Sequence, residues 1–259
     1  MLVDYHVHLD KLEWSAGTIE KMCATAKKSG VDKVGVVIHT KSLMGFEPLY
    51  SHILKSGEKH KKLKFDKDPD KYIDFLKSAK SKGLPILIGV EICYSPEGEP
   101  FLRDIIKKYD FDYTIGSVHL IGIMHFKTVV KLTGDTKKVG SIYYTHVLKA
   151  INSGLFNIIG HIEVARREGI PGLNYYPDLL NDICDSLIKN NCAIEINTKW
   201  LVRHGSIVPE RETLKYMKDK GVKLVFGSDA HHIERIGYGE RIAESAIADA
   251  GFRGFSTIG

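Results

Sequence analysis

The chain has 259 residues, of which 43% are hydrophobic and 27% charged, and its formal net charge is +5. This size and composition fit one globular domain with a large core, and we expect a single domain over residues 1–259. No apolar run reaches the roughly 18 residues of a membrane-spanning helix. The N-terminal MLVDYHVHLD does not resemble a secretory signal, and the four cysteines lack CxxC spacing. We therefore expect reduced thiols in a cytoplasmic protein.

The positive charge is concentrated in one lysine-rich segment, residues 55–71, which contains GEKHKKLKFDKD. Such a run could contact nucleic acid, but only Phe65 interrupts it and no RNA-binding signature surrounds it. A solvated loop is the more common origin of a charge run. We expect a small-molecule ligand and not nucleic acid, and the sequence leaves the oligomeric state open.

Seven short apolar runs along the chain are typical of β-strands. Several are rich in Val and Ile without polar alternation, as expected for strands buried on both faces. Amphipathic stretches such as TIEKMCATAKKSG separate most of them and predict helices, so parallel strands with right-handed crossovers are expected. In chain order the runs are LVDYHVH (2–8), KVGVVIH (33–39), PILIGVE (85–91), FDYTIGSVH (111–119), LFNIIGH (155–161), CAIEIN (192–197) and VKLVFGSD (222–229).

The longest irregular region runs from about Thr40 to Pro69, between the second and third predicted strands. Connections of this length inside a compact domain are often covers of active sites. The stretch FEPLYSHILKSG within it suggests partial helix formation. We therefore expect a lid-like insertion at about residues 40–69.

Six of the seven predicted strands end on a side chain that can bind a metal ion. In a parallel barrel the carboxyl ends of all strands open to the same face, where active sites are built. Residues far apart in the sequence would therefore converge at that face. The six residues are His8, His39, Glu91, His119, His161 and Asp229.

Further details of these motifs favour a metal cluster. His6 and His8 are two apart and would share one face of the first strand. Glu91 ends an apolar run, where a buried carboxylate is costly unless it is paired or metal-bound. Asp229 and His231 are again two apart. Each histidine alone would fit a hydrogen-bonded core residue equally well, but their predicted convergence favours metal binding.

The type and number of these side chains narrow the choice of metal. Imidazole and carboxylate ligands without thiolates suit zinc, manganese, iron or cobalt, and we expect zinc, manganese or iron. Eight candidate ligands exceed the needs of one tetrahedral ion and indicate two or three divalent ions. Adjacent ions can stabilise both the attacking and the leaving oxygen of a phosphoester, which favours phosphoester hydrolysis.

Six motifs in series resemble the polymerase-and-histidinol-phosphatase (PHP) superfamily, and most closely its histidinol-phosphate phosphatase branch. They are DYHVH, GVEI, YDFDYTIGSVHLI, SGLFNIIGHIEVARR, AIEINTKWLVR and GVKLVFGSDAHH, and they extend from residue 4 beyond residue 232. The resemblance implies an α/β fold, a distorted seven-stranded (β/α)7 TIM-like barrel, with up to three metal ions. It also implies hydrolysis of L-histidinol phosphate to L-histidinol and phosphate, a step of histidine biosynthesis.

The resemblance also assigns roles to residues. Glu91, His119, Asp229 and His231 would be catalytic as well as metal-binding, with Glu91 bridging two ions. The implied metal ligands are His6, His8, His39, Glu91, His119, His161, Asp229 and His231.

Other residues are expected to contact the substrate. Arg166, Arg167 and Arg203 follow the fifth and sixth predicted strands, and an arginine fork fits the oxygens of a phosphate. Asn197 shares a strand face with Glu195, and either could orient a ligand or the substrate or have a buried structural role. No carboxylate that would bind the amine of histidinol phosphate is recognisable.

One position departs from the pattern of the family. Family members commonly carry another histidine shortly after HxH, in a segment like CGHAxG. This chain has LEWSAG there, with Trp14 in the place of the histidine. Asp10 or Glu13 could supply the missing ligand, or the third metal site could be weaker or absent.

Three other functions stay open. The chain could hydrolyse another small phosphoester, such as a nucleotide or a sugar phosphate, with the same metals. A metal-dependent amidohydrolase also begins with HxH, but such enzymes usually have a metal-bridging lysine where this chain has His119. A non-enzymatic binding protein would be consistent with Trp14, whereas eight retained ligands argue against it.

Overall fold

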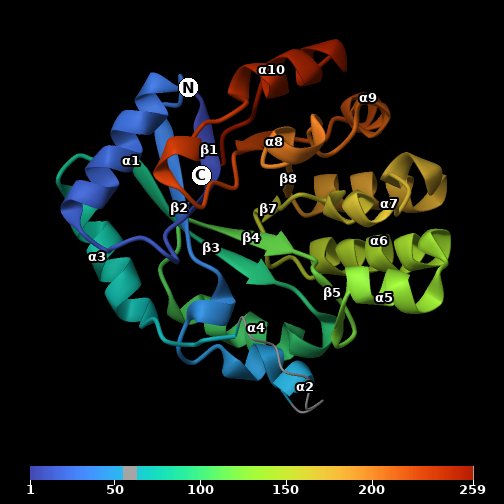
Figure 1. Ribbon diagram of the computed structural model, residues 1–259, viewed down its shortest axis with the longest axis horizontal. Helices are drawn as coiled ribbons and strands as arrows, with labels where there is room; N and C mark the ends of the chain where they lie inside the picture. Colours follow the sequence, from blue (N-terminus) through green and yellow to red (C-terminus); the bar gives the residue numbers. More distant parts are fainter. Residues whose placement is uncertain (55–62, 259) are drawn as a thin grey trace.

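The computed structural model describes residues 1–54 and 63–258, apart from the side chains of His52 and Arg203. Seven parallel strands form a closed barrel, because β1 pairs with both β2 and β9. The predicted seven-stranded α/β barrel is confirmed (Figure 1). Its strands, in spatial order, are β1 (Val3–His8), β2 (Lys33–Val37), β3 (Ile86–Cys93), β4 (Tyr113–Ser117), β7 (Ile158–Ile159), β8 (Ala193–Asn197) and β9 (Leu224–Gly227).

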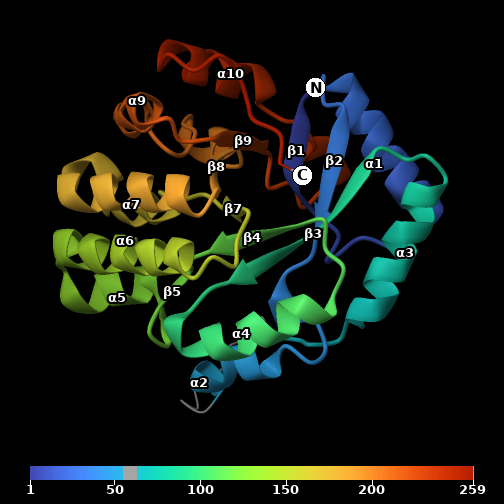
Figure 2. The same ribbon diagram turned by 180° about the vertical axis from the view of Figure 1, so that it is seen from behind.

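Helices surround the barrel, with α1 and α3 on one side and α5, α6 and α7 on the other (Figures 1 and 2). A small antiparallel hairpin, β5 (Leu120–Ile121) and β6 (Met124–His125), follows β4. No helix in the described ranges is long and apolar enough to cross a membrane. The helices are α1 (Ala16–Lys28), α2 (Ser51–Leu54), α3 (Pro69–Ser81), α4 (Glu99–Ile105), α5 (Phe126–Thr133), α6 (Thr136–Asn152), α7 (Pro177–Lys189), α8 (Leu201–His204), α9 (Arg211–Lys220) and α10 (Glu240–Asp249).

The ends of the first long helices follow from local sequence. The Ser15 side chain accepts a hydrogen bond from a backbone N–H in the first turn of α1, and Asp68 does the same for α3. Such caps satisfy N–H groups that have no partner inside the helix. Gly30 and Gly83 follow the helices with positive φ, a conformation that glycine adopts without steric cost.

The barrel interior is filled by apolar side chains, which we call the inner apolar layer. Tyr113 and Tyr5 are the largest of them, and a Cβ on Gly35 or Gly89 would overlap the ring or hydroxyl of Tyr113. The Tyr113 hydroxyl donates a 2.6 Å hydrogen bond to the carbonyl of Tyr5. The layer consists of Val3, Tyr5, Val37, Tyr113, Ile115, Ile158, Ala193 and Val225.

Strand β1 contains an irregularity that changes which side chains face inward. Asp4 pairs with Val34, but Val7 pairs with Val36, so β1 has one extra residue in this interval. Val7 packs outside the barrel, whereas Tyr5 belongs to the inner apolar layer. A bulge of this kind re-aims the side chains that follow it. It allows Tyr5 and then the pair His6 and His8 to face the interior.

Four strands end two residues earlier than the sequence predicted. β2, β4, β7 and β9 stop before the metal-capable residue that was expected to end each of them. The residues at the second position beyond these strands are His39, His119, His161 and Asp229. Glu91 lies inside β3, which continues to Cys93. The apolar pattern predicts where a strand lies, but it does not show where pairing gives way to a loop.

The predicted insertion at residues 40–69 is only partly described, because residues 55–62 lie outside the description. The same gap contains much of the lysine-rich segment. The described part of the insertion includes α2. It also includes three buried residues that precede this helix, Phe46, Leu49 and Tyr50. Phe46 packs on Phe101 and Tyr109. A cover over the active site and the single-domain organisation stay predictions.

Candidate metal centre

Glu91 lies at the centre of the site and is 2% exposed. Its Oε2 atom faces three imidazoles from the first two strands and the segments that follow them. Nε2 of His39 lies 2.9 Å away, Nε2 of His8 3.6 Å and Nε2 of His6 3.7 Å. One carboxylate oxygen thus approaches three nitrogens that can bind a cation.

The other oxygen of Glu91 faces the opposite side of the site. Oε1 lies 3.2 Å from Nε2 of His161 and 3.9 Å from Nε2 of His119. It also accepts a 2.8 Å hydrogen bond from the hydroxyl of Ser117. Glu91 therefore lies between two groups of histidines, which is the position a bridging ligand would occupy.

Asp229 and His231 complete the site from the loop after β9. Oδ1 of Asp229 lies 3.3 Å from Nε2 of His8 and 3.9 Å from Nε2 of His6. The same oxygen accepts a 2.8 Å hydrogen bond from Nζ of Lys199. Nδ1 of His231 lies 3.4 Å from it.

The structure therefore brings together all eight residues that the motifs indicated. We call them the ligand cluster. They are His6, His8, His39, Glu91, His119, His161, Asp229 and His231.

Polar atoms without partners are concentrated in this cluster. Buried atoms of this kind normally have a hydrogen-bond partner, and an unsatisfied one costs about 1–3 kcal/mol. A bound cation would supply the missing partner. Within the described residues, the unpartnered atoms of the cluster are Nε2 of His6, Nε2 of His8, Oε2 of Glu91 and Nδ1 of His161.

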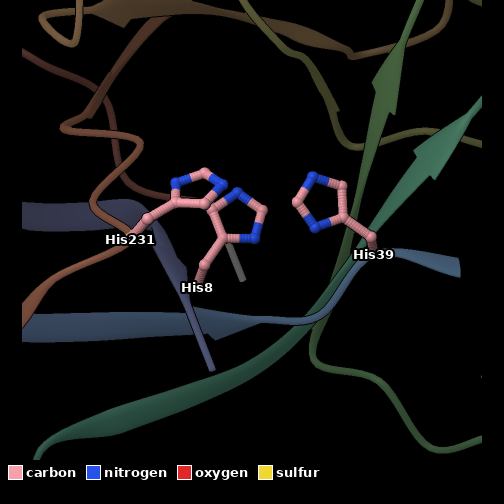
Figure 3. Close-up of side chains that lie close together, drawn as sticks. All are labelled: His8, His39 and His231. Atoms are coloured by element: carbon pink, nitrogen blue, oxygen red, sulfur yellow. The ribbon is translucent and has the colours of Figure 1, made fainter. Parts of the chain in front are cut away.

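Three overlapping groups in the cluster have donor atoms close enough to share one cation. His6, His8 and Glu91 form one, and Glu91, His119 and His161 form a second. The third consists of His8, His39 and His231, with His8 lying between the other two rings (Figure 3). The His8 ring centroid is 4.1 Å from that of His39 and 4.0 Å from that of His231. Imidazole and carboxylate donors of this kind fit zinc, manganese or iron.

The electrostatics of the site keep its carboxylates ionised. Burial would raise the pKa of Glu91, but His39 and His6 hold that pKa well below the usual value. Burial would also raise the pKa of Asp229, but the charges of Lys199 and His6 outweigh burial and lower that pKa. Two ionised carboxylates surrounded by imidazoles are a suitable environment for a divalent cation.

Two of the histidines are held in the neutral form. Burial lowers the pKa of His119 well below its usual value. Burial, together with the nearby His8 and Lys199, lowers the pKa of His231 to about 3. A neutral imidazole has a free ring-nitrogen lone pair, which is the form that binds a metal.

Glu195 positions two of the ligands. Its Oε1 lies 2.6 Å from Nδ1 of His6, and its Oε2 accepts a 2.6 Å hydrogen bond from the backbone N–H of His161. A Cβ on Gly227 would overlap this carboxylate. The contact directs Nε2 of His6 towards Glu91, as carboxylates behind metal-binding histidines commonly do. Of the three roles considered for Glu195, orientation of a ligand is the one that this geometry supports.

Backbone strain is located at two ligands. His161 and Asp229 have φ values of 30° and 50°, a region that side chains other than glycine rarely adopt. Each residue stands two positions after the end of a short strand, His161 after β7 and Asp229 after β9. Strain of this kind persists where the surrounding structure enforces it, and it is common at functional sites. At these two positions, the strained backbone conformation occurs where a ligand side chain turns into the cluster.

The three arginines predicted to bind phosphate differ in their surroundings. The guanidinium of Arg166 is paired with carboxylates of Glu210 and Glu163. Arg167 instead lies 5.0 Å from the ring centroid of Phe126 and 5.1 Å from that of Trp200. The side chain of Arg203 lies outside the described residues. Arg167 has one longer carboxylate contact, 3.6 Å from its Nε to Oε1 of Glu168, and it lines the cavity beside the cluster.

A cavity of about 340 Å³ adjoins the ligand cluster. Asp229 and His231 form one part of its lining, and Arg167, Lys199 and Arg235 contribute positive charge. Trp200 and Tyr238 give it an aromatic wall. Asn197 is not part of this lining; it is buried, and its amide lies 3.5 Å from Oδ2 of Asp229.

The unusual position Trp14 is not part of the cluster. Its indole stacks on Phe75 with 6.2 Å between ring centroids and lies 5.7 Å from the ring of Tyr72, both on α3. Glu13 is exposed. Asp10 contacts His8 and His39 through Nδ1 of each ring.

Sequence reasoning missed Lys199. This residue stands two positions after Asn197 at the end of β8. Its Nζ lies 3.4 Å from Nδ1 of His231 as well as close to Asp229. The available signal was its position, since a residue just beyond a barrel strand lies at the active face.

Comparison with curated proteins finds relatives with one common description. The chain is 29% identical over 175 residues to the "Probable histidinol-phosphatase" of Deinococcus radiodurans and 26% identical over 193 residues to the histidinol-phosphatase of Bacillus subtilis. The aligned segments cover 66% and 64% of this chain. They span about two thirds of those relatives, namely 66% and 70% of their lengths.

A solved structure has the same fold over nearly the whole chain. It is histidinol phosphate phosphatase from Lactococcus lactis, complexed with zinc, L-histidinol and phosphate. The superposition covers 99% of this chain and 96% of that chain, with a TM-score of 0.76 and 20% sequence identity. A family model, the PHP domain, matches residues 4–199, which contain six of the eight ligand-cluster residues. This match covers more than half of the sequence, it confirms the resemblance of the motifs, and the chain belongs to the PHP domain family.

Proposed function

We propose that the chain is a metal-dependent phosphomonoesterase that hydrolyses L-histidinol phosphate to L-histidinol and phosphate. The observation that carries the proposal is the ligand cluster itself, in which buried Glu91 faces imidazoles from both sides and several donor atoms have no partner. The relatives that bear the name histidinol-phosphatase support the choice of substrate.

We further propose that the cluster holds two or three divalent ions, zinc, manganese or iron. His6, His8, Glu91 and Asp229 would hold one ion, and Glu91, His119 and His161 a second. When bound, such ions supply Lewis-acid stabilisation of the charge on a phosphoryl group. Glu91 has the position of a residue shared by the two.

The chain's own residues would bind and orient the ester. Arg167 presents a guanidinium at the cavity, where its fork can bind two phosphate oxygens. Its guanidinium packs on the rings of Phe126 and Trp200, which restricts its orientation. Lys199 would add a point charge on the same side, and Trp200 and Tyr238 would exclude water around the alcohol part of the substrate.

The test is phosphate release by enzyme that has been stripped with a chelator and reloaded separately with Zn²⁺, Mn²⁺ or Fe²⁺. The panel contains L-histidinol phosphate, nucleotides and sugar phosphates. We expect metal-dependent turnover with a strong preference for histidinol phosphate. No hydrolysis with any of the metals would contradict the proposal.

One observation favours a second candidate, a phosphatase for another small phosphoester. Among the described residues lining the cavity, the positive side chains are Arg167, Lys199 and Arg235, and the carboxylate is Asp229 of the cluster. The amine of histidinol phosphate would therefore meet positive charge. In the same panel, turnover of a sugar phosphate or nucleotide above that of histidinol phosphate would favour this second candidate.

A further inference from the structure

Asp10, two residues beyond β1, is a carboxylate surrounded by four hydrogen-bonding groups. Its Oδ2 lies 2.9 Å from Nδ1 of His8 and 3.0 Å from Nδ1 of His39. Its Oδ1 accepts hydrogen bonds from the backbone N–H of His39 at 3.2 Å and from the Ser42 hydroxyl at 3.0 Å. The side chain is 11% exposed. One carboxylate thus connects β1 to the segment that follows β2.

These contacts determine which nitrogen of each ring can bind a cation. An ionised carboxylate only accepts hydrogen bonds, so Nδ1 of both His8 and His39 must carry a proton. The lone pair of each neutral ring is then on Nε2. Both Nε2 atoms face Oε2 of Glu91, at 3.6 Å and 2.9 Å. Asp10 therefore directs two ligands towards the interior of the cluster.

The two rings held by Asp10 are also two of the three histidines in Figure 3. The third is His231, whose Nδ1 lies 3.0 Å from the backbone carbonyl oxygen of Asp229. Among the described contacts, none joins His231 to Asp10. In the turn that follows β1, Trp14 packs away from the cluster on α3 and Glu13 is exposed. The group of His8, His39 and His231 thus depends on Asp10 for the orientation of two members.

We propose that Asp10 is a positioning residue that directs Nε2 of both His8 and His39 into the metal centre of this chain, in which Trp14 contributes no ligand. Asp10 acts by fixing the proton of two imidazoles on Nδ1, and not as a ligand itself. The inference rests on the metal centre of the proposed function and not on its substrate.

Asp10→Asn tests this role because it keeps the size of the side chain. If the amide oxygen accepts from the His39 backbone and Ser42, the NH2 group faces both Nδ1 atoms and forces the ring protons onto Nε2. If the amide is turned around, its NH2 group faces the N–H of His39, which is also a donor. Either orientation removes at least one of the favourable contacts.

Two measurements report on the site without using phosphatase activity. Metal content after Zn²⁺ loading and gel filtration counts the ions retained, and competition with a chromophoric chelator gives their affinities. We expect Asp10→Asn to weaken the most weakly held ion by about 10–100-fold, the range for loss of a partner behind a metal ligand. An ion should be retained by Glu91, His119 and His161, since none of these contacts Asp10.

Nitrogen-15 NMR of the histidine rings reports the tautomers directly. In the zinc-loaded protein, His8 and His39 should carry their protons on Nδ1. In Asp10→Asn they should keep them there only if the amide oxygen faces the rings, which costs the contact with the His39 backbone N–H. Ser42→Ala is the matched control, since it removes one bond to Asp10 but leaves both Nδ1 contacts, and it should retain wild-type metal content. Wild-type affinity for every ion in a folded Asp10→Asn protein, or equal weakening of every ion, would overturn the proposal.

Discussion

The inner apolar layer and the ligand cluster occupy the same barrel but differ in how their polar atoms are satisfied. In the apolar layer, the hydroxyl of Tyr113 donates to the carbonyl of Tyr5, and the hydroxyl of Tyr5 is bonded to the backbone of Ile258. In the cluster, ring nitrogens of His6 and His8 and an oxygen of Glu91 have no hydrogen-bond partner. Buried groups of the first kind stabilise the fold. Those of the second kind cost stability unless a ligand binds them.

This difference predicts that mutations in the two regions have separable effects. Changes in the apolar layer should alter the free energy of unfolding with little effect on hydrolysis, because its contacts are complete within the protein. Changes in the ligand cluster should alter metal content and turnover with little loss of stability in the metal-free protein. Four substitutions test the separation.

The largest effect is expected for Glu91→Gln. It removes the charge between the two groups of histidines and places an amide NH2 where an oxygen faces His39 or His161. Metal stabilisation of several kcal/mol corresponds to a loss of about 10³-fold or more in the rate of phosphate release. The circular-dichroism melting curve of the metal-free variant should stay close to that of metal-free wild type, since bound metal would itself stabilise the wild-type fold. Glu97→Gln, at an exposed position, is the control. Retention of a tenth of the wild-type turnover in Glu91→Gln would contradict the expected separation between the two regions.

Gly35→Ala should have the next largest effect, and on stability. The added Cβ would lie 2.8 Å from the Cα of Tyr5 and overlap the hydroxyl of Tyr113. Overpacking of this kind destabilises by about 3 kcal/mol at the upper end of its usual range. Chemical denaturation would measure the loss, and turnover per folded molecule should be unchanged. Gly17→Ala has open space around the new Cβ and should not be destabilising, so equal effects of the two would contradict the steric argument.

Arg167→Lys is expected to change substrate binding more than it changes the free energy of unfolding or the metal content. Lysine keeps the charge but loses the fork and the stacking between Phe126 and Trp200. A lost charge-assisted hydrogen bond of about 2 kcal/mol would lower kcat/KM roughly 30-fold. Arg166→Lys should change kcat/KM much less, because Glu210 and Glu163 already engage that guanidinium. The reverse order would assign the phosphate contact to Arg166.

The smallest effect is expected for Tyr113→Phe. It removes the hydrogen bond to the carbonyl of Tyr5 and leaves the ring in place. The loss should be about 1 kcal/mol in the free energy of unfolding, with wild-type metal content and turnover. Tyr175→Phe, at a side chain that is 69% exposed, provides the comparison. Loss of bound metal in Tyr113→Phe would show that the two regions are coupled.

The sequence predicted the barrel and the ligand cluster for the same physical reason. Strands buried on both faces must be apolar, so a polar residue such as Glu91 or His161 is conspicuous within or just after such a run. Parallel pairing then requires that these residues meet at one face of the barrel. The fold and the convergence of the cluster could therefore be predicted without knowing any long-range contact.

Other features of the site depend on contacts that the pattern does not contain. The direction of His161 and Asp229 depends on the φ of one residue each, and the predicted strand ends at these positions were wrong by two residues. Asp10 and Lys199 acquire their roles from partners about 30 residues away in the chain. Neither hydrophobic periodicity nor ligand spacing reports such pairs.

The extra residue in β1 makes the metal centre sensitive to the length of the chain as well as to its composition. Side chains of a strand alternate between its two faces, so the inward direction of His6 and His8 depends on whether an odd or even number of residues separates them from Val3. Loss of Tyr5, which lies between Asp4 and Val7, would leave every ligand in the sequence while turning part of this strand outward. In related chains, therefore, the HxH motif indicates a competent site only when the spacing that precedes it is retained.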